Sequence, residues 1–157
     1  MLKSLNELLL IVEEFKNQGK KIVTFNGSFD ILHAGHIKAF REAKSKGDCL
    51  IVFINSDKSV KSYKGEDRPI IPEQDRALMV SAIDGVDYVS LFDESDPRVV
   101  LEQIKPHIHC NGLEWGENCV EAKVVKENGG EIHILKQHNG ISTSKIIEKI
   151  LKLHKKE

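Results

Sequence analysis

The chain has 157 residues, of which 40% are hydrophobic, so its length and apolar content suit one domain with a core of its own. Its 23 Lys and Arg residues nearly balance 24 Asp and Glu residues, and the formal net charge is −1. A nucleic-acid or membrane surface would need a basic excess, so we expect neither partner. The three cysteines lack C-x-x-C spacing, which indicates reduced thiols in a cytoplasmic protein and no protein-held metal site.

The predicted elements alternate between helices and strands. An amphipathic N-terminal helix (4–18) comes first, and the glutamates in its apolar pattern argue against a signal peptide. Short β-branched runs then predict five strands. These strands lie at 20–26, 49–55, 87–92, 107–111 and 131–136. Helical periodicity fills the intervals and the C-terminal end. These helices lie at 35–46, 73–84, 97–104, 118–128 and 142–154.

Strands that alternate with helices imply right-handed crossovers and a parallel sheet covered on both faces. We therefore expect an α/β fold, a Rossmann-like doubly wound sheet of five parallel strands. Residues 1–157 would form one domain, with the N-terminal helix packed on it. Ligand sites of such sheets lie beyond the carboxyl ends of the strands, where the first strand delivers its motif.

The segment after the first strand has the features of a phosphate site. It reads Asn26-Gly27-Ser28-Phe29-Asp30, and a glycine here lets a ligand approach backbone N–H groups closely. His33 and His36 then open a helix, whose N-terminus favours negative charge. Gly35 leaves room between them, so both imidazoles can donate hydrogen bonds to phosphoryl oxygens. Incidental histidines or a metal pair are the alternatives, and nearby carboxylate ligands for a metal are missing.

A second anion-binding turn is predicted before the last helix. It reads Gly140-Ile141-Ser142-Thr143-Ser144, and Ser142 is a reasonable N-cap. Three hydroxyls beside free N–H groups can bind an anion. Plain helix capping is the alternative reading of this turn.

Together, the H-x-G-H and G-I-S-T-S segments resemble the nucleotidylyltransferase superfamily, in which such motifs bind nucleotide phosphates. The resemblance is cytidylyltransferase-like and covers about residues 5–152. Within it, N-S-D-K-S-V and K-G-E-D-R-P-I resemble the adenylyltransferases of the ADP-heptose pathway. This branch implies transfer of AMP from ATP to a sugar 1-phosphate resembling heptose phosphate, with release of pyrophosphate.

The resemblance implies roles for further residues. Lys44, at the end of the helix that His36 opens, is expected to reach the phosphates, and compensation of the helix dipole is its alternative role. Five more residues are expected near the nucleotide or the acceptor: Asn55, Asp57, Lys64, Arg68 and Arg76. Arg76 could instead pair with neighbouring acids on a solvated face.

The segment 111–122 departs from the heptose branch, which reads K-G-G-D-Y or K-G-G-D-W after the fourth strand. Here Asn111-Gly112-Leu113-Glu114-Trp115 lacks the lysine charge, at the place where an acceptor should dock. Gly112, Glu114 and Trp115 remain candidate contacts, and Trp115 either stacks on a base or sugar or simply packs. The glycerol-3-phosphate cytidylyltransferases, which use CTP and a polyol phosphate, are the alternative branch. They carry an arginine where this chain has Gln137.

The implied reaction is an in-line displacement, in which the acceptor phosphate attacks the α-phosphorus of ATP or CTP and pyrophosphate leaves. Mg²⁺ is expected to bridge phosphate oxygens and to take most of its ligands from the nucleotide and water. A non-catalytic nucleotide-binding protein is the less favoured alternative. We expect a homodimer, and whether a sugar kinase is fused to or partnered with the chain stays open.

Overall fold

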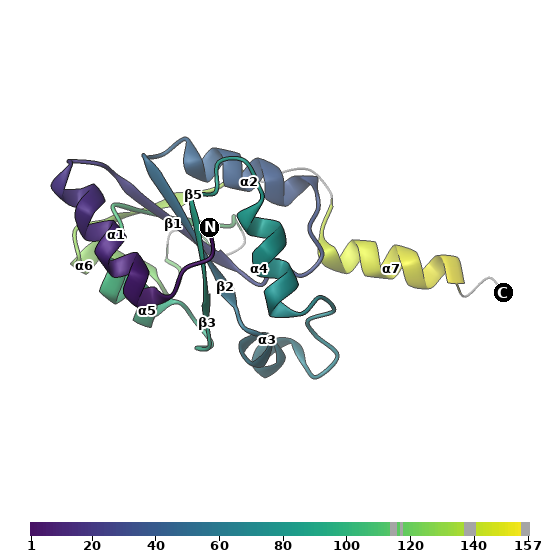
Figure 1. The fold of residues 1–157 in the computed structure, drawn as a ribbon. Coiled ribbons are helices and arrows are strands. Elements are labelled where there is room, and N and C mark those ends of the chain that lie inside the picture. Colours follow the sequence, from purple (N-terminus) through teal and green to yellow (C-terminus); the bar gives the residue numbers. More distant parts are fainter. Residues whose placement is uncertain (114–115, 117, 137–140, 155–157) are drawn as a thin grey trace.

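The computed structural model describes residues 1–113, 116, 118–136 and 141–154, and Figure 1 shows their arrangement. Five parallel strands form one sheet in the order β3-β2-β1-β4-β5. The strands are β1 (Ile22–Gly27), β2 (Cys49–Asn55), β3 (Tyr88–Phe92), β4 (Ile108–Asn111) and β5 (Glu131–Ile134). The predicted Rossmann-like α/β fold and its five strands are confirmed.

Helices cover both faces of this sheet, as its doubly wound topology requires (Figure 1). One face carries α2 (Ala34–Lys44) and α4 (Glu73–Ser81). The other carries α1 (Leu5–Asn17), α5 (Arg98–Ile104) and α6 (Ala122–Glu127). Helix α1 packs on the sheet by burying apolar side chains such as Leu8 and Val12 in the second of these cores.

Successive side chains of a strand point to opposite faces, so the strands feed the two cores alternately. In β1, Val23 and Phe25 enter the core under α2 and α4, and Ile22 enters the other core. Every residue of β2 is buried, as expected for an inner strand covered on both sides. The topology reverses between β1 and β4, because β2 and β3 lie on one side of β1 while β4 and β5 lie on the other. A ligand crevice is therefore expected beyond the carboxyl ends of β1 and β4.

Helix α3 (Asp57–Lys64) was not predicted, because the sequence between the second strand and residue 73 reads as a turn-rich loop. Its signal is a polar cap: the Ser56 hydroxyl accepts a hydrogen bond from the Ser59 N–H at 3.2 Å. Its apolar content is low, so hydrophobic periodicity does not reveal it.

Helix α7 (Thr143–His154) leaves the body of the molecule and extends away from it (Figure 1). None of its described residues is buried. Within the ranges described above, no helix combines the length and the apolar character that a membrane span needs.

Candidate functional site

The turn between β1 and α2 is built around the buried ring of Phe29. Phe29 has a φ of 45°, and its ring packs edge-on against Phe25 with centroids 5.4 Å apart. A Cβ added at Gly27 would come within 2.9 Å of the Phe29 ring. Glycine is therefore required here by the packing of the turn itself, in addition to the predicted approach of a ligand.

His33 and His36 cap the start of α2 with their ring nitrogens. The Nδ1 of His33 accepts a hydrogen bond from the Gly35 N–H at 3.1 Å, and the Nδ1 of His36 accepts one from the His33 N–H at 3.3 Å. The two rings stack with centroids 3.9 Å apart. Because both Nδ1 atoms accept, each neutral ring carries its proton on Nε2. Neither Nε2 has a hydrogen-bond partner in the part of the chain that the structure describes, so two parallel donors are available.

Both imidazoles are uncharged at neutral pH. Burial lowers the pKa of His33. Burial, and then the positive charges of His33 and Lys64, lower the pKa of His36 to about 4. A bound anion would reverse this effect by favouring the charged ring.

Lys64 lies at this same turn. Its Nζ donates a hydrogen bond to the Ser28 hydroxyl at 2.9 Å, and burial together with the charge of Arg68 lowers its pKa. The end of α3 therefore brings a cation to the start of α2, close enough to affect the titration of His36.

The start of α7 meets the turn before α2. The Thr143 hydroxyl donates to the Ile31 carbonyl at 3.2 Å. Ser142 caps the helix as predicted, because its hydroxyl accepts from the Lys145 N–H at 3.3 Å and its carbonyl accepts from the Ile146 N–H. The two predicted anion-binding turns thus adjoin each other. Ser144 is in the first turn of α7, Ile141 is exposed, and Gly140 lies outside the described residues.

The structure does not bring Lys44 to these turns, which corrects the expectation that it reaches the phosphates. Lys44 ends α2, and its Nζ bonds the Asp87 carboxylate and the Asp48 carbonyl, both at 2.6 Å. These partners precede β3 and β2, so Lys44 lies at the amino ends of the strands. Helix α2 runs antiparallel to the strands and separates Lys44 from His33 by its whole length.

Asp30 and Arg68 neutralise each other. Asp30 accepts bonds from the Ile70 and Ile71 N–H groups, both at 2.9 Å, and lies 2.6 Å from the Arg68 guanidinium. Burial opposes ionisation of Asp30, but these donors outweigh it and lower its pKa. Both residues were predicted to contact a ligand. In the structure, their ion pair joins the loop before α4 to the turn after β1.

Arg76 is fully buried, so it lies neither on a solvated face nor within reach of a ligand. Its guanidinium donates to the Asn55 carbonyl and the Asp57 carboxylate, both at 2.8 Å, and to the carbonyls of Ile71 and Ser28. The prediction of direct nucleotide contact is wrong for this side chain. Arg76 instead joins the segments that follow β1 and β2.

Asn55 and Asp57 are also engaged within the protein. The Asn55 amide donates to the Ser59 hydroxyl at 3.0 Å, and the Asp57 N–H donates to the Glu73 carboxylate at 2.6 Å. The side chain of Asp57 stays 37% exposed, so of the two it is the one still open to a ligand. Asn55 is buried and holds α3 against the end of β2.

The segment after β4 places a carboxylate beside the crevice. Asn111 ends β4, its amide donates to Glu121 at 3.3 Å, and its side-chain oxygen accepts from the Gly112 N–H at 3.0 Å. Glu121 is buried, and the sequence alone did not single it out. The predicted contacts Glu114 and Trp115 lie outside the described residues.

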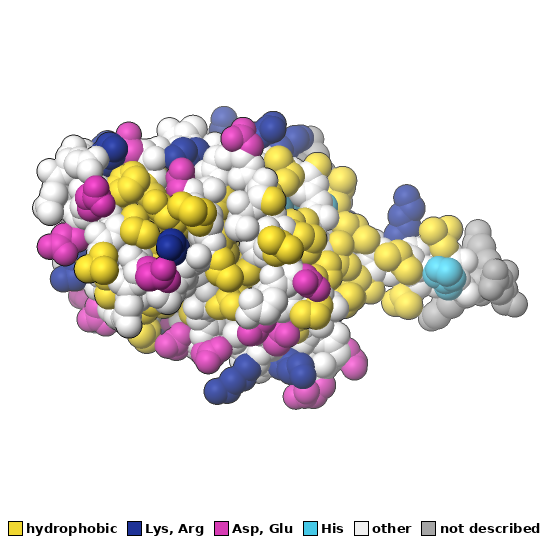
Figure 2. All heavy atoms as spheres, in the orientation of Figure 1, with side chains coloured by type: hydrophobic (Ala, Val, Ile, Leu, Met, Phe, Trp, Pro, Cys, Tyr) yellow, Lys and Arg dark blue, Asp and Glu magenta, His cyan; other side chains and the backbone are white. Residues whose placement is uncertain are grey.

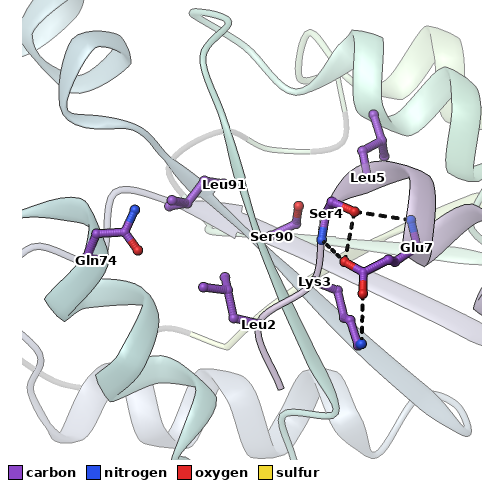
Figure 3. A pocket seen from close by; sticks show the side chains of 8 residues that line it. All are labelled: Leu2, Lys3, Ser4, Leu5, Glu7, Gln74, Ser90 and Leu91. Carbon is purple, nitrogen blue, oxygen red and sulfur yellow. Dashed lines mark hydrogen bonds and ion pairs between the residues drawn. The ribbon is translucent and has the colours of Figure 1, made fainter.

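A separate shallow hollow of about 460 Å³ lies beside the start of α1, where the N-terminal residues pair with the edge of β3 (Figure 3). Its charged groups satisfy each other, because Lys3 donates to Glu7 at 2.9 Å and Glu7 also bonds Ser4. This hollow offers no unpaired charge to an anionic ligand, so the candidate site stays at the starts of α2 and α7.

A parallel sheet with two adjoining helix starts above its carboxyl edge is a nucleotidyltransferase architecture, and the chain is an enzyme of this class. Residues 24–149 match the family described as cytidylyltransferase-like, and the chain belongs to that family.

Curated relatives extend this similarity over nearly the whole chain. The chain is 43% identical to the bifunctional protein HldE of Geobacter metallireducens over 157 residues, which cover 99% of this chain and 32% of that protein. It is also 43% identical to the bifunctional protein HldE of Wolinella succinogenes, over 89% of this chain and 29% of that one. The chain therefore spans about a third of the length of these relatives.

Solved structures agree with the fold. The lipopolysaccharide core biosynthesis protein of Thermoplasma volcanium has a TM-score of 0.65 at 30% identity, covering 77% of this chain and all of that one. The pantoate-beta-alanine ligase of Francisella tularensis has a TM-score of 0.62 at 15% identity, over 97% of this chain and 78% of that one. The second likeness shows the fold alone.

Proposed function

We propose that residues 1–157 form a single nucleotidylyltransferase domain that transfers AMP from ATP to a sugar 1-phosphate resembling heptose phosphate and releases pyrophosphate. The observation that carries this proposal is the junction of the two helix starts, at which Thr143 bonds Ile31. Two such starts at one edge can bind a polyphosphate from both sides.

In this mechanism the Nε2–H groups of His33 and His36 donate to the α- and β-phosphate region. These hydrogen bonds strengthen as negative charge grows on the phosphate oxygens in the transition state. Lys64 and the turn Ser142–Ser144 hold the β- and γ-phosphates, and backbone N–H groups of the Gly27–Ser28 turn add further donors. No covalent intermediate is needed, because the acceptor phosphate is itself a nucleophile and catalysis is mainly positioning.

Other predicted site residues would act indirectly, by holding the phosphate-binding segments in place. Arg76 and the Asp30–Arg68 pair fix the loops on which the phosphate-binding groups stand. Mg²⁺ would arrive with the nucleotide and neutralise phosphate charge. The ion would take most of its ligands from phosphate and water. Among the described residues there is no group of three His, Cys, Asp or Glu side chains placed to hold a metal ion.

Three observations support a sugar phosphate as the acceptor. The N-S-D-K-S-V and K-G-E-D-R-P-I segments resemble the ADP-heptose branch. The relatives named above are HldE proteins, and a solved relative is described as a lipopolysaccharide core biosynthesis protein. These names do not favour the cytidylyltransferase alternative. Asn111 stands where the heptose branch has a lysine, so the proposed acceptor end lacks that cationic contact to an acceptor phosphate. We further propose that the enzyme works in the cytoplasm.

The test is a pyrophosphate-release screen that crosses ATP and CTP with heptose 1-phosphate, glycerol 3-phosphate and ribitol phosphate. We expect release with ATP and the heptose phosphate, and loss of a transition-state donor in His36→Ala should slow it by about 10²-fold or more. If the folded wild-type protein binds ATP but releases no pyrophosphate with any acceptor, it is a nucleotide-binding protein and the proposal fails.

A further inference from the structure

Two buried polar atoms lack a hydrogen-bond partner in the part of the chain that the structure describes. They are the Nε2 of His109, on β4, and the Oδ1 of Asn26, on β1. Leaving such an atom unpaired costs free energy, and native proteins contain few of them. Neither atom takes part in the contacts described above, so the pair needs a physical explanation.

The two side chains are neighbours on one face of the sheet. Strands β1 and β4 pair in parallel, with Thr24 opposite His109. Side chains two residues apart on a strand point to the same face, so Asn26 shares the face of His109 and lies about 7 Å nearer the carboxyl end. His109 is 0% exposed, and its ring is hidden beneath the surface atoms that Figure 2 shows. Asn26 therefore lies between this enclosed ring and the crevice beyond β1 and β4.

The contact with Thr24 decides which ring nitrogen of His109 carries the proton. The Thr24 hydroxyl lies 2.8 Å from the His109 Nδ1 and has no other hydrogen-bond partner among the described residues. Donation from this hydroxyl to Nδ1 pairs its proton, whereas the reverse arrangement would leave that proton unpaired in the core. The Nε2 atom then carries the ring proton. Burial lowers the pKa of His109 to about 3, so the ring is neutral and Nε2–H is its one donor.

The two unpaired atoms therefore complement each other, because Nε2–H is a donor and the amide oxygen Oδ1 accepts. Asn26 as a whole is only partly buried, although its Oδ1 is enclosed. The amide thus turns its oxygen into the protein, and its NH2 group is the part available to a ligand. A water molecule between the two side chains can complete the bond, since water both accepts and donates.

We propose that His109 is a positioning residue, whose Nε2–H group holds the Asn26 oxygen inward through one bound water, so that the amide NH2 group faces the nucleotide phosphates. The reversed amide would present its oxygen to the phosphates, where two acceptors have no proton to share. This role rests on the proposed nucleotidyl transfer, in which Asn26 begins the predicted phosphate-binding segment.

The link between the two residues is tested first without nucleotide, by nitrogen-15 NMR of the histidine rings in the full chain. We expect His109 in the Nε2–H form, with a ring proton that exchanges slowly with solvent. Asn26→Leu removes the acceptor and should speed this exchange about fivefold. Asn26→Asp keeps an acceptor oxygen and is the matched control, in which exchange stays slow. An Nδ1–H ring, or exchange that Asn26→Leu leaves unchanged, would overturn the proposal whether or not the chain transfers nucleotides.

Pyrophosphate release tests the consequence for the reaction. His109→Leu should lower kcat about tenfold with little change in the KM for ATP, because the NH2 group bonds most strongly in the transition state. His109→Gln restores an N–H donor and should recover most of this loss. The double variant of His109→Leu and Asn26→Leu should be no slower than Asn26→Leu alone, because His109 acts only through Asn26.

Thr24→Val separates this role from a general effect on the core. It removes the other hydrogen bond of the His109 ring, so it should lower the unfolding midpoint while kcat stays within about twofold of wild type. Losses that add in the double variant, or a Thr24→Val enzyme as slow as His109→Leu, would refute the positioning role. A wild type that releases no pyrophosphate would instead contradict the proposed function, and the NMR result would still decide whether His109 holds Asn26.

Discussion

The Thr143 hydroxyl donates a hydrogen bond to the Ile31 carbonyl, and this contact joins two helix starts that lie 112 residues apart. Removing the donor in Thr143→Val keeps the side-chain shape but releases the start of α7. A neutral hydrogen bond contributes about 1 kcal/mol, so we expect the KM for ATP to rise about fivefold. Steady-state pyrophosphate release measures it.

Thr143→Ser keeps the hydroxyl and is the control for this change. It should bind ATP as the wild type does, while the unfolding midpoint of both variants stays close to the wild-type value. Equal KM values for the valine and serine variants would mean that the contact does not organise the site.

Lys44 and Lys64 each end a helix, but their replacement should affect activity differently. Lys64→Met removes a cation at the proposed phosphate site, where a charged hydrogen bond is worth about 1.5–3 kcal/mol, so kcat/KM for ATP should fall about 10- to 100-fold. Lys44→Met removes the ion pair with Asp87 at the far end of α2, so kcat/KM should stay within about twofold while stability drops.

Both variants are compared by initial rates at limiting ATP and by thermal unfolding. The reverse pattern, with activity lost in Lys44→Met and kept in Lys64→Met, would restore the original expectation for Lys44 and remove Lys64 from the site.

The fold was predictable because its signals are local. Each strand is a short β-branched run, and β2 is apolar throughout because both of its faces are covered. Helix α3 was missed for the complementary reason: Val60 is its one fully buried hydrophobic residue, and polar contacts from Ser56 and Asn55 hold the helix in place.

Of the candidate site, only the residues that cap helix starts could be predicted from the sequence. His33, His36 and Ser142 cap helices, and capping can be read from residue order. The partner of a charged side chain depends instead on which loops meet in space. Lys44 pairs with Asp87 across 43 positions, and Arg76 reaches Ser28 across 48, so residue order alone offers no reason to remove either from the proposed phosphate site.

Arg76 should matter for stability more than for chemistry. Arg76→Met leaves the Asp57 carboxylate and three carbonyls without their donor, and leaving buried acceptors unpaired costs about 3 kcal/mol. Urea unfolding should show this loss of free energy. Arg98→Met is the matched control, because Arg98 pairs with Asp96 at the surface and its removal should barely move the urea midpoint. An Arg76→Met protein as stable as Arg98→Met would show that the loops do not depend on this guanidinium.

Protonation of His36 should accompany ATP binding in mild acid. The free ring has a pKa of about 4 because of burial and the charges of His33 and Lys64, so it is neutral at pH 5.5. A polyphosphate beside Nε2 favours the imidazolium and raises this pKa. Binding at pH 5.5 should therefore take up a proton, and the uptake should vanish by pH 8, where the ring is neutral in both states.

Calorimetry of ATP binding in buffers with different ionisation enthalpies counts these protons. His36→Asn is the control, since the asparagine amide can cap the helix but does not titrate, and subtracting it removes the protonation of ATP itself. Stability follows from the same shift: above pH 6.5 the ring is neutral in the folded and unfolded states and has no effect, and between pH 6.5 and about 4 the unfolded state takes up the proton more readily, so the free energy of unfolding falls as the pH falls. If wild type and His36→Asn take up the same number of protons at pH 5.5, the His36 ring does not face the phosphates.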